Sequence, residues 1–141
     1  MSTDELKALT VRSFDVLHND GNLNAVEEFI GNDFINRDTP AEMPGGPAGI
    51  RAVITMLRAG FPDLHITVQE MVAEGDTVVA NTVFRGTHIG NFLGLPATGR
   101  PVEQEQYHVL RFRDGKVVEH RSLRDDLGMM RQLGVIPAAL P

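Results

Sequence analysis

The chain has 141 residues, a formal net charge of −6 and no cysteine. This length fits one domain, residues 1–141, which can bury a core without covalent staples. The missing cysteine excludes disulfides and thiolate sites, and lysines and arginines scattered singly make nucleic acid a poor partner.

Metal and membrane binding are not expected either. The five histidines show neither HxH nor HExxH spacing, so the sequence predicts no metal site. No stretch resembles a signal peptide, and nowhere do about 18 apolar residues stand together. We therefore expect a cytoplasmic protein without a membrane partner.

Helical patterns fill the first half of the chain. Ser2 and Glu5 have the spacing of a capping box, and apolar residues at helical spacing follow them. Asn22 is a candidate N-cap for a second, short helix. The pattern predicts helices over 3–18, after Asn22 and over 48–59, with an extended segment at 34–38 and a loop at 39–47.

From Phe61 onward the pattern alternates, as in strands. A first hairpin turns at Gly75 and Asp76, and a second turns at Asp114 and Gly115, where glycine supplies the positive φ of a tight turn. A C-terminal helix is predicted over residues 126–133. Helices followed by antiparallel hairpins indicate an α+β domain, a cone in which helices pack on a curved sheet and enclose a pocket.

The second hairpin carries the most informative pattern. A turn symmetric about Asp114 and Gly115 pairs His108 with Arg121, and it turns His120 away from the pocket. The residues that would then share one face are Gln104, Gln106, His108, Leu110, Glu119, Arg121, Leu123 and Asp125. So polar a face is unusual for a core and suits the wall of a pocket.

Three stretches resemble the SnoaL-like polyketide cyclases, a family of the NTF2-like superfamily of cone-shaped α+β barrels. They are AGFPDLHITVQEMVAEGDTVVA, GTHIGNFLGLPATGR and FRDGKVVEHRSLRDDLGMMRQLG. The resemblance implies ring closure by intramolecular aldol condensation, without metal or cofactor. It also implies a polyketide-like or other small hydrophobic ligand and a homodimer, for which we expect the outer sheet face with Tyr107, Val109 and Val118.

The resemblance also implies the catalytic residues. In the E-H-W-x-x-x-D segment of the family the aspartate acts as acid and base, and this position falls on Asp125 here. His108 is the match for the assisting pocket histidine, and a cation at Arg121 would hold it neutral. Two positions depart from the family pattern, Arg121 in place of tryptophan and Arg37 in place of histidine.

Alternatives remain open for these residues. Asp125 or Asp126 could serve only as the cap of the C-terminal helix, and Arg121 could bind a substrate oxygen or merely pair with an acid. The further candidate binding residues are Gln106, Glu119, Phe92, His88 and Arg37. For the whole protein, an epoxide hydrolase and a non-catalytic binding protein are the competing hypotheses.

Overall fold

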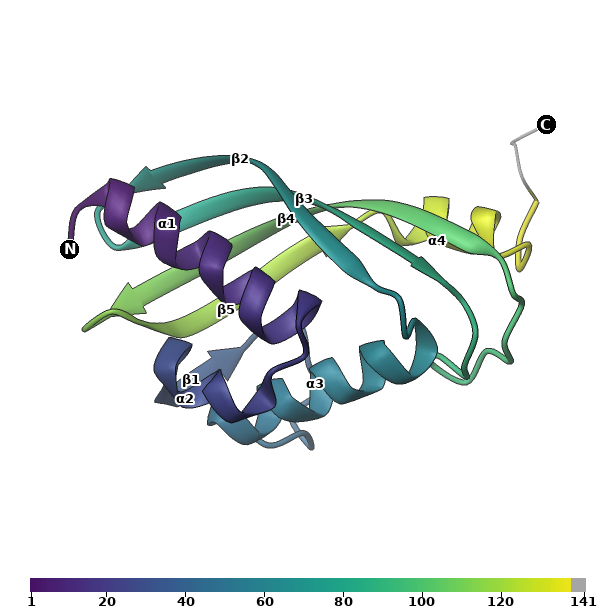
Figure 1. The fold of residues 1–141 in the computed structure, drawn as a ribbon, viewed down its shortest axis with the longest axis horizontal. Coiled ribbons are helices and arrows are strands. Elements are labelled where there is room, and N and C mark those ends of the chain that lie inside the picture. Colours follow the sequence, from purple (N-terminus) through teal and green to yellow (C-terminus); the bar gives the residue numbers. More distant parts are fainter. Residues whose placement is uncertain (138–141) are drawn as a thin grey trace.

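The computed structural model describes residues 1–137 and has helices packed against one curved sheet (Figure 1). The helical elements are α1 (Thr3–Ser13), the π-helical segment η1 (Phe14–Asn19), the 3₁₀ segment η2 (Leu23–Ala25), α2 (Val26–Phe29), α3 (Gly46–Gly60) and α4 (Asp126–Gln132). The strands are β1 (Ile30–Asn36), β2 (His65–Glu74), β3 (Thr77–Thr87), β4 (Pro101–Arg113) and β5 (Lys116–Arg124). Within residues 1–137, no helix is long and apolar enough to cross a membrane.

The first helix begins where the sequence predicts. The side chain of Ser2 accepts the backbone N–H of Glu5, and the side chain of Glu5 accepts the backbone N–H of Ser2, so the capping box is confirmed. The predicted helix over residues 3–18 is helical throughout, but its last part is the π-helical segment η1 instead of α-helix. Asn22 occupies the N-cap position of η2 as predicted, but its side chain makes no capping hydrogen bond.

The sheet has the strand order β1-β5-β4-β3-β2. Three neighbouring pairs are antiparallel, and β1 runs parallel to β5. This parallel pairing brings the segment after β1 next to the second hairpin, although more than 80 residues separate them. The predicted α+β architecture is confirmed.

The second hairpin has the predicted turn but a different register. Asp114 and Gly115 both have positive φ, 52° and 76°, as a tight two-residue turn requires. Phe112 pairs with Val117 as predicted, but the register shifts by one residue immediately beyond this pair. Val118 is the extra residue of this β-bulge.

The bulge exchanges the two faces of β5. Leu110 pairs with His120 instead of Glu119, and His108 pairs with Ser122 instead of Arg121. The predicted pairing of His108 with Arg121 is therefore wrong, because one inserted residue moves every later side chain to the opposite face.

The inward face of β4 places a polar row between two apolar clusters. Burial alternates along the whole strand, and the buried residues in chain order are Val102, Gln104, Gln106, His108, Leu110 and Phe112. Phe112 belongs to one apolar cluster with α2 and α3, whereas Val102 belongs to a second cluster around Phe61. The middle of β4 therefore presents the polar side chains of Gln104, Gln106 and His108 to the space between the sheet and the helices.

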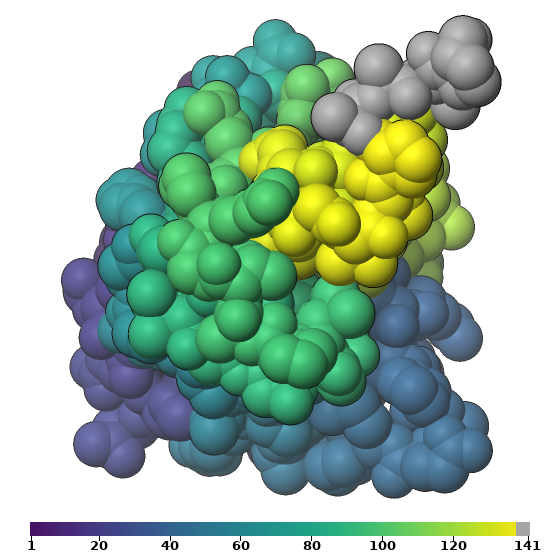
Figure 2. Space-filling model, turned by 90° about the vertical axis from the view of Figure 1, so that its right-hand side faces the viewer, coloured from purple at the N-terminus to yellow at the C-terminus, as the bar shows by residue number. Residues whose placement is uncertain are grey.

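One end of the molecule is covered by two segments. Figure 2 shows the loop that follows β3, in green, beside α4 and the residues after it, in yellow. Phe92 of this loop is only 8% exposed and packs in the same cluster as Met129 of α4. These two segments cover this end of the space between sheet and helices.

Candidate functional site

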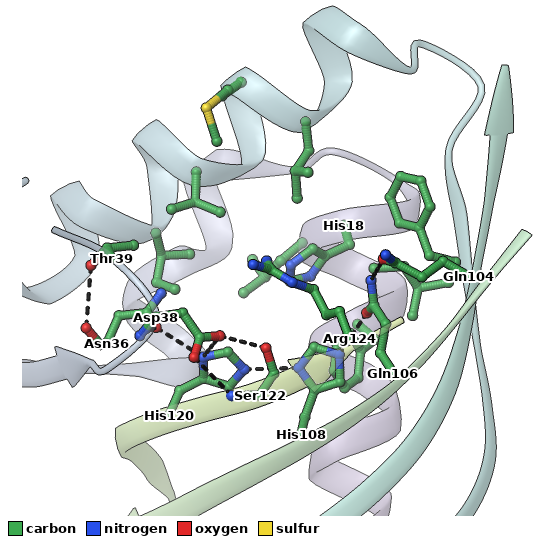
Figure 3. Close-up of a pocket in the computed structure, with 18 of the residues that line it drawn as sticks. His18, Asn36, Asp38, Thr39, Gln104, Gln106, His108, His120, Ser122 and Arg124 are labelled. Carbon is green, nitrogen blue, oxygen red and sulfur yellow. Dashed lines mark hydrogen bonds and ion pairs between the residues drawn. The ribbon is translucent and has the colours of Figure 1, made fainter. Parts of the chain in front are cut away.

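A cavity of about 430 Å³ lies between the concave face of the sheet and the helices. This volume suits a small organic ligand. Figure 3 shows its polar side chains, which come from η1, from β1 and the turn after it, and from β4 and β5. The labelled residues are His18, Asn36, Asp38, Thr39, Gln104, Gln106, His108, His120, Ser122 and Arg124.

A continuous row of hydrogen-bonded side chains crosses one wall of the cavity. At one end, Gln104 Nε2 donates to Asp126 Oδ1 at 3.1 Å, and Gln106 Nε2 donates to Gln104 Oε1 at 2.9 Å. His108 Nε2 lies 2.8 Å from Gln106 Oε1, and its Nδ1 lies 2.8 Å from His120 Nε2. The two imidazole rings are stacked, with centroids 5.1 Å apart.

The row ends at β1 and the turn that follows it. His120 Nδ1 lies 3.1 Å from Asn36 Oδ1 and 3.7 Å from Asp38 Oδ2. Asp38 is held in place by Ser122, whose backbone N–H donates to Asp38 Oδ1 at 2.9 Å and whose hydroxyl donates to Asp38 Oδ2. A carboxylate that is only 16% exposed and has such partners is fixed in position and can stabilise a cation beside it.

Burial controls the charge of the histidines. It lowers the pKa of His108 well below its usual value, and the neighbouring His120 acts in the same direction. Burial also lowers the pKa of His18 to about 4. For His120, burial lowers the pKa while the carboxylate of Asp38 opposes this change.

His18 makes stability depend on pH. Its folded-state pKa of about 4 lies below the usual 6.5, so the unfolded chain binds the proton first as pH falls. The contribution of His18 to the free energy of unfolding is intact above about pH 6.5, and roughly 2 to 3 kcal/mol of that free energy is lost by about pH 4.5. Urea unfolding at both pH values should therefore show that H18Q loses less stability on acidification than the wild type. Equal losses would contradict this assignment.

Apolar side chains form the rest of the cavity. Phe14 packs edge-on against His108, with ring centroids 5.1 Å apart, and Phe34 and Leu57 contribute further apolar surface. The four methionines of the lining are Met43, Met56, Met129 and Met130. Because methionine side chains adapt to irregular shapes, this part of the cavity can accept a bulky, largely apolar ligand.

Asp125 does not lie on the cavity wall. It is exposed and caps α4, since its Oδ1 accepts the backbone N–H of Gly128 at 2.9 Å. The prediction that Asp125 faces the pocket is wrong because α4 begins there and the alternation of β5 has ended. Asp126 is the neighbouring carboxylate that lines the cavity.

Loss of this cap has a measurable cost. Replacing Asp125 with alanine is expected to lower the free energy of unfolding by about 1 kcal/mol, because the backbone N–H of Gly128 in the first turn of α4 loses its acceptor. Chemical denaturation would measure this change. An equivalent change at Glu28, an exposed carboxylate that caps no helix, should have almost no effect; equal losses for both variants would refute the capping role.

Arg121, Glu119 and Arg37 lie outside the cavity. Arg121 is exposed, as its pairing with Val109 on the outer face requires. Glu119 forms ion pairs with Arg37 at 3.8 Å and with Arg111 at 3.3 Å. The prediction that these residues line the pocket is wrong: the bulge turns Glu119 and Arg121 of β5 outward, and Arg37, in the turn after β1, is exposed and pairs with Glu119 on that side.

The remaining predicted residues divide into two groups. His88 is fully buried away from the cavity, where Nδ1 bonds the Thr98 hydroxyl at 3.0 Å and the ring stacks on Phe61. Gln106, His108 and Phe92 do line the cavity. The roles of these three residues stay predictions.

Sequence reasoning missed several residues of the site. The sequence predicts the wrong face for His120 and does not single out Arg124, and the available signal was the adjacent pair Val117 and Val118, which breaks the alternation. Arg124 extends into the cavity on the side of His18 (Figure 3). Asp38 carried no local signal, because only the parallel pairing of β1 with β5 brings it to the histidines.

Comparison with known proteins agrees with this architecture. A family model described as SnoaL-like polyketide cyclase matches residues 8–133. Aklanonic acid methyl ester cyclase DnrD of Streptomyces peucetius is 37% identical over 127 residues, covering 88% of this chain and 88% of the relative. Nogalonic acid methyl ester cyclase of Streptomyces nogalater is 34% identical over 118 residues, covering 82% of this chain and 88% of the relative.

Solved structures show the same fold. TsrD from Streptomyces laurentii superposes with a TM-score of 0.88 at 27% identity, covering 96% of this chain and 99% of that one. A SnoaL-like polyketide cyclase from Agrobacterium tumefaciens gives a TM-score of 0.80 at 25% identity, covering 95% of this chain and 100% of that one. The similarity therefore extends over nearly the whole domain.

Proposed function

Because this chain belongs to the SnoaL-like polyketide cyclase family, we propose that it closes a ring in a polyketide-like substrate by an intramolecular aldol reaction. The family predicted from the sequence is confirmed, and relatives named as cyclases support an enzyme of this type. The observation that carries the proposed mechanism is the row of imidazole, amide and carboxylate groups on the wall of an otherwise apolar cavity.

Each step of an aldol closure has a suitable group in this row. A base removes a proton from a carbon next to one carbonyl, and an acid protonates the oxygen of the carbonyl that is attacked. The carboxylate of Asp126 is suited to the first task and the His108–His120 pair to the second. Arg124 lines the same cavity and can stabilise the negative charge of the enolate oxygen.

The cavity also limits the substrate class. Its apolar lining and its volume of about 430 Å³ favour a bulky, flat or polycyclic ligand over a small polar metabolite. The two relatives are named as cyclases of the methyl esters of aklanonic acid and nogalonic acid. We infer a methyl ester of a polyketide acid as substrate, since an ester leaves only one charged group, the enolate, to be stabilised.

The test is incubation of the purified protein with aklanonic acid methyl ester, followed by liquid chromatography and mass spectrometry. Ring closure rearranges bonds without adding or losing atoms, so the expected product has the mass of the substrate and a different retention time. Heat-treated protein controls for spontaneous closure.

The other outcomes separate the competing functions. Ligand binding without any product would favour a binding protein, and it would contradict the proposed cyclase activity for this substrate class. An epoxide hydrolase would instead convert a terpene epoxide into a product heavier by one water. Screening both substrate types in parallel therefore distinguishes the three hypotheses.

A homodimer and a cytoplasmic location stay predictions from the sequence. The outer face of the sheet supports the former, because Tyr107 is 48% exposed and Leu123 is 82% exposed on it. Exposed large apolar side chains on a sheet face suit contact with a second copy of the chain. Light scattering coupled to size-exclusion chromatography would determine the oligomeric state.

A further inference from the structure

The polar row has an acceptor at each of its ends. At one end, the carboxylate of Asp126 accepts from Gln104 and faces Arg124 Nε at 3.7 Å. At the other end, Asn36 Oδ1 accepts the backbone N–H of Asp38 at 3.1 Å, which fixes the orientation of the Asn36 amide. Both ends of the row therefore require protons from the groups between them.

The two imidazole rings must supply these protons. The carboxylate end orients both glutamine amides so that Gln106 presents its oxygen to His108 Nε2, which must carry a proton. His120 Nδ1 faces the oxygen of Asn36 and must carry another. The contact between the two rings, 2.8 Å from His108 Nδ1 to His120 Nε2, needs a third proton. Two neutral imidazoles carry only two ring protons, so the pair carries one in excess.

The charges around the pair act in opposite directions. Asp38, on the turn after β1, lies 3.7 Å from His120 Nδ1 and favours the extra proton. Arg124 on β5 and His18 on η1 oppose it, as does the burial of both rings. Without the extra proton, one of these three contacts would place a ring nitrogen at hydrogen-bond distance from an oxygen or from the other ring's nitrogen with no hydrogen between them, which costs free energy.

The row has a second arrangement that keeps every hydrogen bond. If Asp126 is protonated and both glutamine amides rotate, each amide donates in the opposite direction and the two imidazoles become neutral. The excess proton has then moved from the histidine pair to Asp126. The side chain of Asp126 is 63% exposed, so it can release that proton to solvent.

We propose that Asp38 is a positioning residue that keeps one excess proton on the His108–His120 pair, and that the row alternates between this state and one with the proton on Asp126. The inference rests on the proposed function for its use in catalysis. The inference goes beyond the proposed function because it assigns the source of the proton and gives a role to Asp38. In this scheme Asp38 touches no substrate atom.

The proton balance of ring closure matches these two states. The substrate C–H bond breaks and its proton goes to the Asp126 carboxylate. The new C–C bond forms with the electron pair that is left, and the electrons of the attacked carbonyl move to its oxygen. This oxygen takes the excess proton of the histidine pair, so one turnover converts the first state into the second.

The first test counts the ring protons directly. In ¹⁵N-labelled full-length protein at about pH 5.5, chosen below the usual histidine pKa of about 6.5 because burial lowers the pKa of both rings, side-chain NMR should find three protonated nitrogens on His108 and His120. The variant D38N should show two. The control D33N changes an exposed aspartate outside the cavity and should retain three. Should D38N fail to fold, S122A, which removes a hydroxyl donor to Asp38, replaces it.

The second test uses the pH profile of turnover. Because catalysis needs the protonated pair, the rate should fall as pH rises past the pKa of that pair. In D38N this fall should begin at a pH lower by about one unit or more, with little change in KM, since an opposite charge has been removed.

The results separate this inference from the proposed function. Two ring protons in the wild type, or three retained in D38N, would overturn the role of Asp38 even if the protein closes rings. Three ring protons without ring closure would overturn the proposed function and the catalytic use of the proton, while the count itself would stand.

Discussion

Replacing His108 with glutamine is expected to lower the turnover of ring closure by about 10² to 10⁴-fold, the usual range for loss of a general acid or base. Glutamine can still donate a hydrogen bond to Gln106, so the row keeps much of its geometry. It cannot exchange a proton at neutral pH. The loss should therefore appear in kcat, whereas KM should change little.

A matched substitution controls for nonspecific effects. His65 is an exposed histidine that does not line the cavity, so H65Q should leave the turnover unchanged. Circular dichroism and thermal unfolding would show whether H108Q keeps the fold. A folded H108Q enzyme with wild-type turnover would exclude His108 from the chemistry.

Replacing Phe61 with alanine should have the largest effect on stability. Its ring is fully buried and packs edge-on against Phe84 and Phe92, with centroids 5.2 and 5.1 Å away, and it stacks on His88 at 5.4 Å. The cavity left by its removal is expected to cost about 3 to 5 kcal/mol. Because domains of this size are stable by only about 5 to 15 kcal/mol, much of the total would be lost.

Urea unfolding monitored by circular dichroism would measure this effect. Leu123 offers a matched control, because it is apolar but 82% exposed, and its replacement by alanine should change stability by less than about 0.5 kcal/mol. A loss below about 1 kcal/mol for F61A would mean that Phe61 does not organise this end of the core.

The sequence predicted one side of the polar wall for a clear physical reason. Along β4 the alternation is unbroken, so Gln104, Gln106 and His108 had to share a face with Leu110. The turn at Asp114 and Gly115 was also predictable, because few sequences accept two successive residues with positive φ. These local rules are sufficient to predict which residues of β4, the first strand of the hairpin, face the pocket.

The other side of the wall could not be predicted by the same rules. A bulge at Val118 reverses the facing of every later residue, and the sequence of β5 is compatible with either register because Leu123 suggested a buried face. In the structure Leu123 is exposed and His120 faces the cavity. A single extra residue thus changed the partner of His108 from Arg121 to His120.

Long-range pairing determined the rest of the site. Asp38 reaches His120 only because β1 lies parallel to β5, a pairing between segments more than 80 residues apart. The choice between Asp125 and Asp126 depended on where β5 ends and α4 begins. Helix boundaries are the least reliable feature of a sequence prediction, and here one residue separates the cap from the cavity.

The most direct test of the site compares H108Q and D125N in one assay with aklanonic acid methyl ester, at a temperature at which both variants are folded. If the chemistry takes place at the row inside the cavity, D125N should keep nearly wild-type turnover and H108Q should lose about 10²-fold or more. Loss of turnover in D125N with full activity in H108Q would contradict this assignment and place the chemistry at the end of β5.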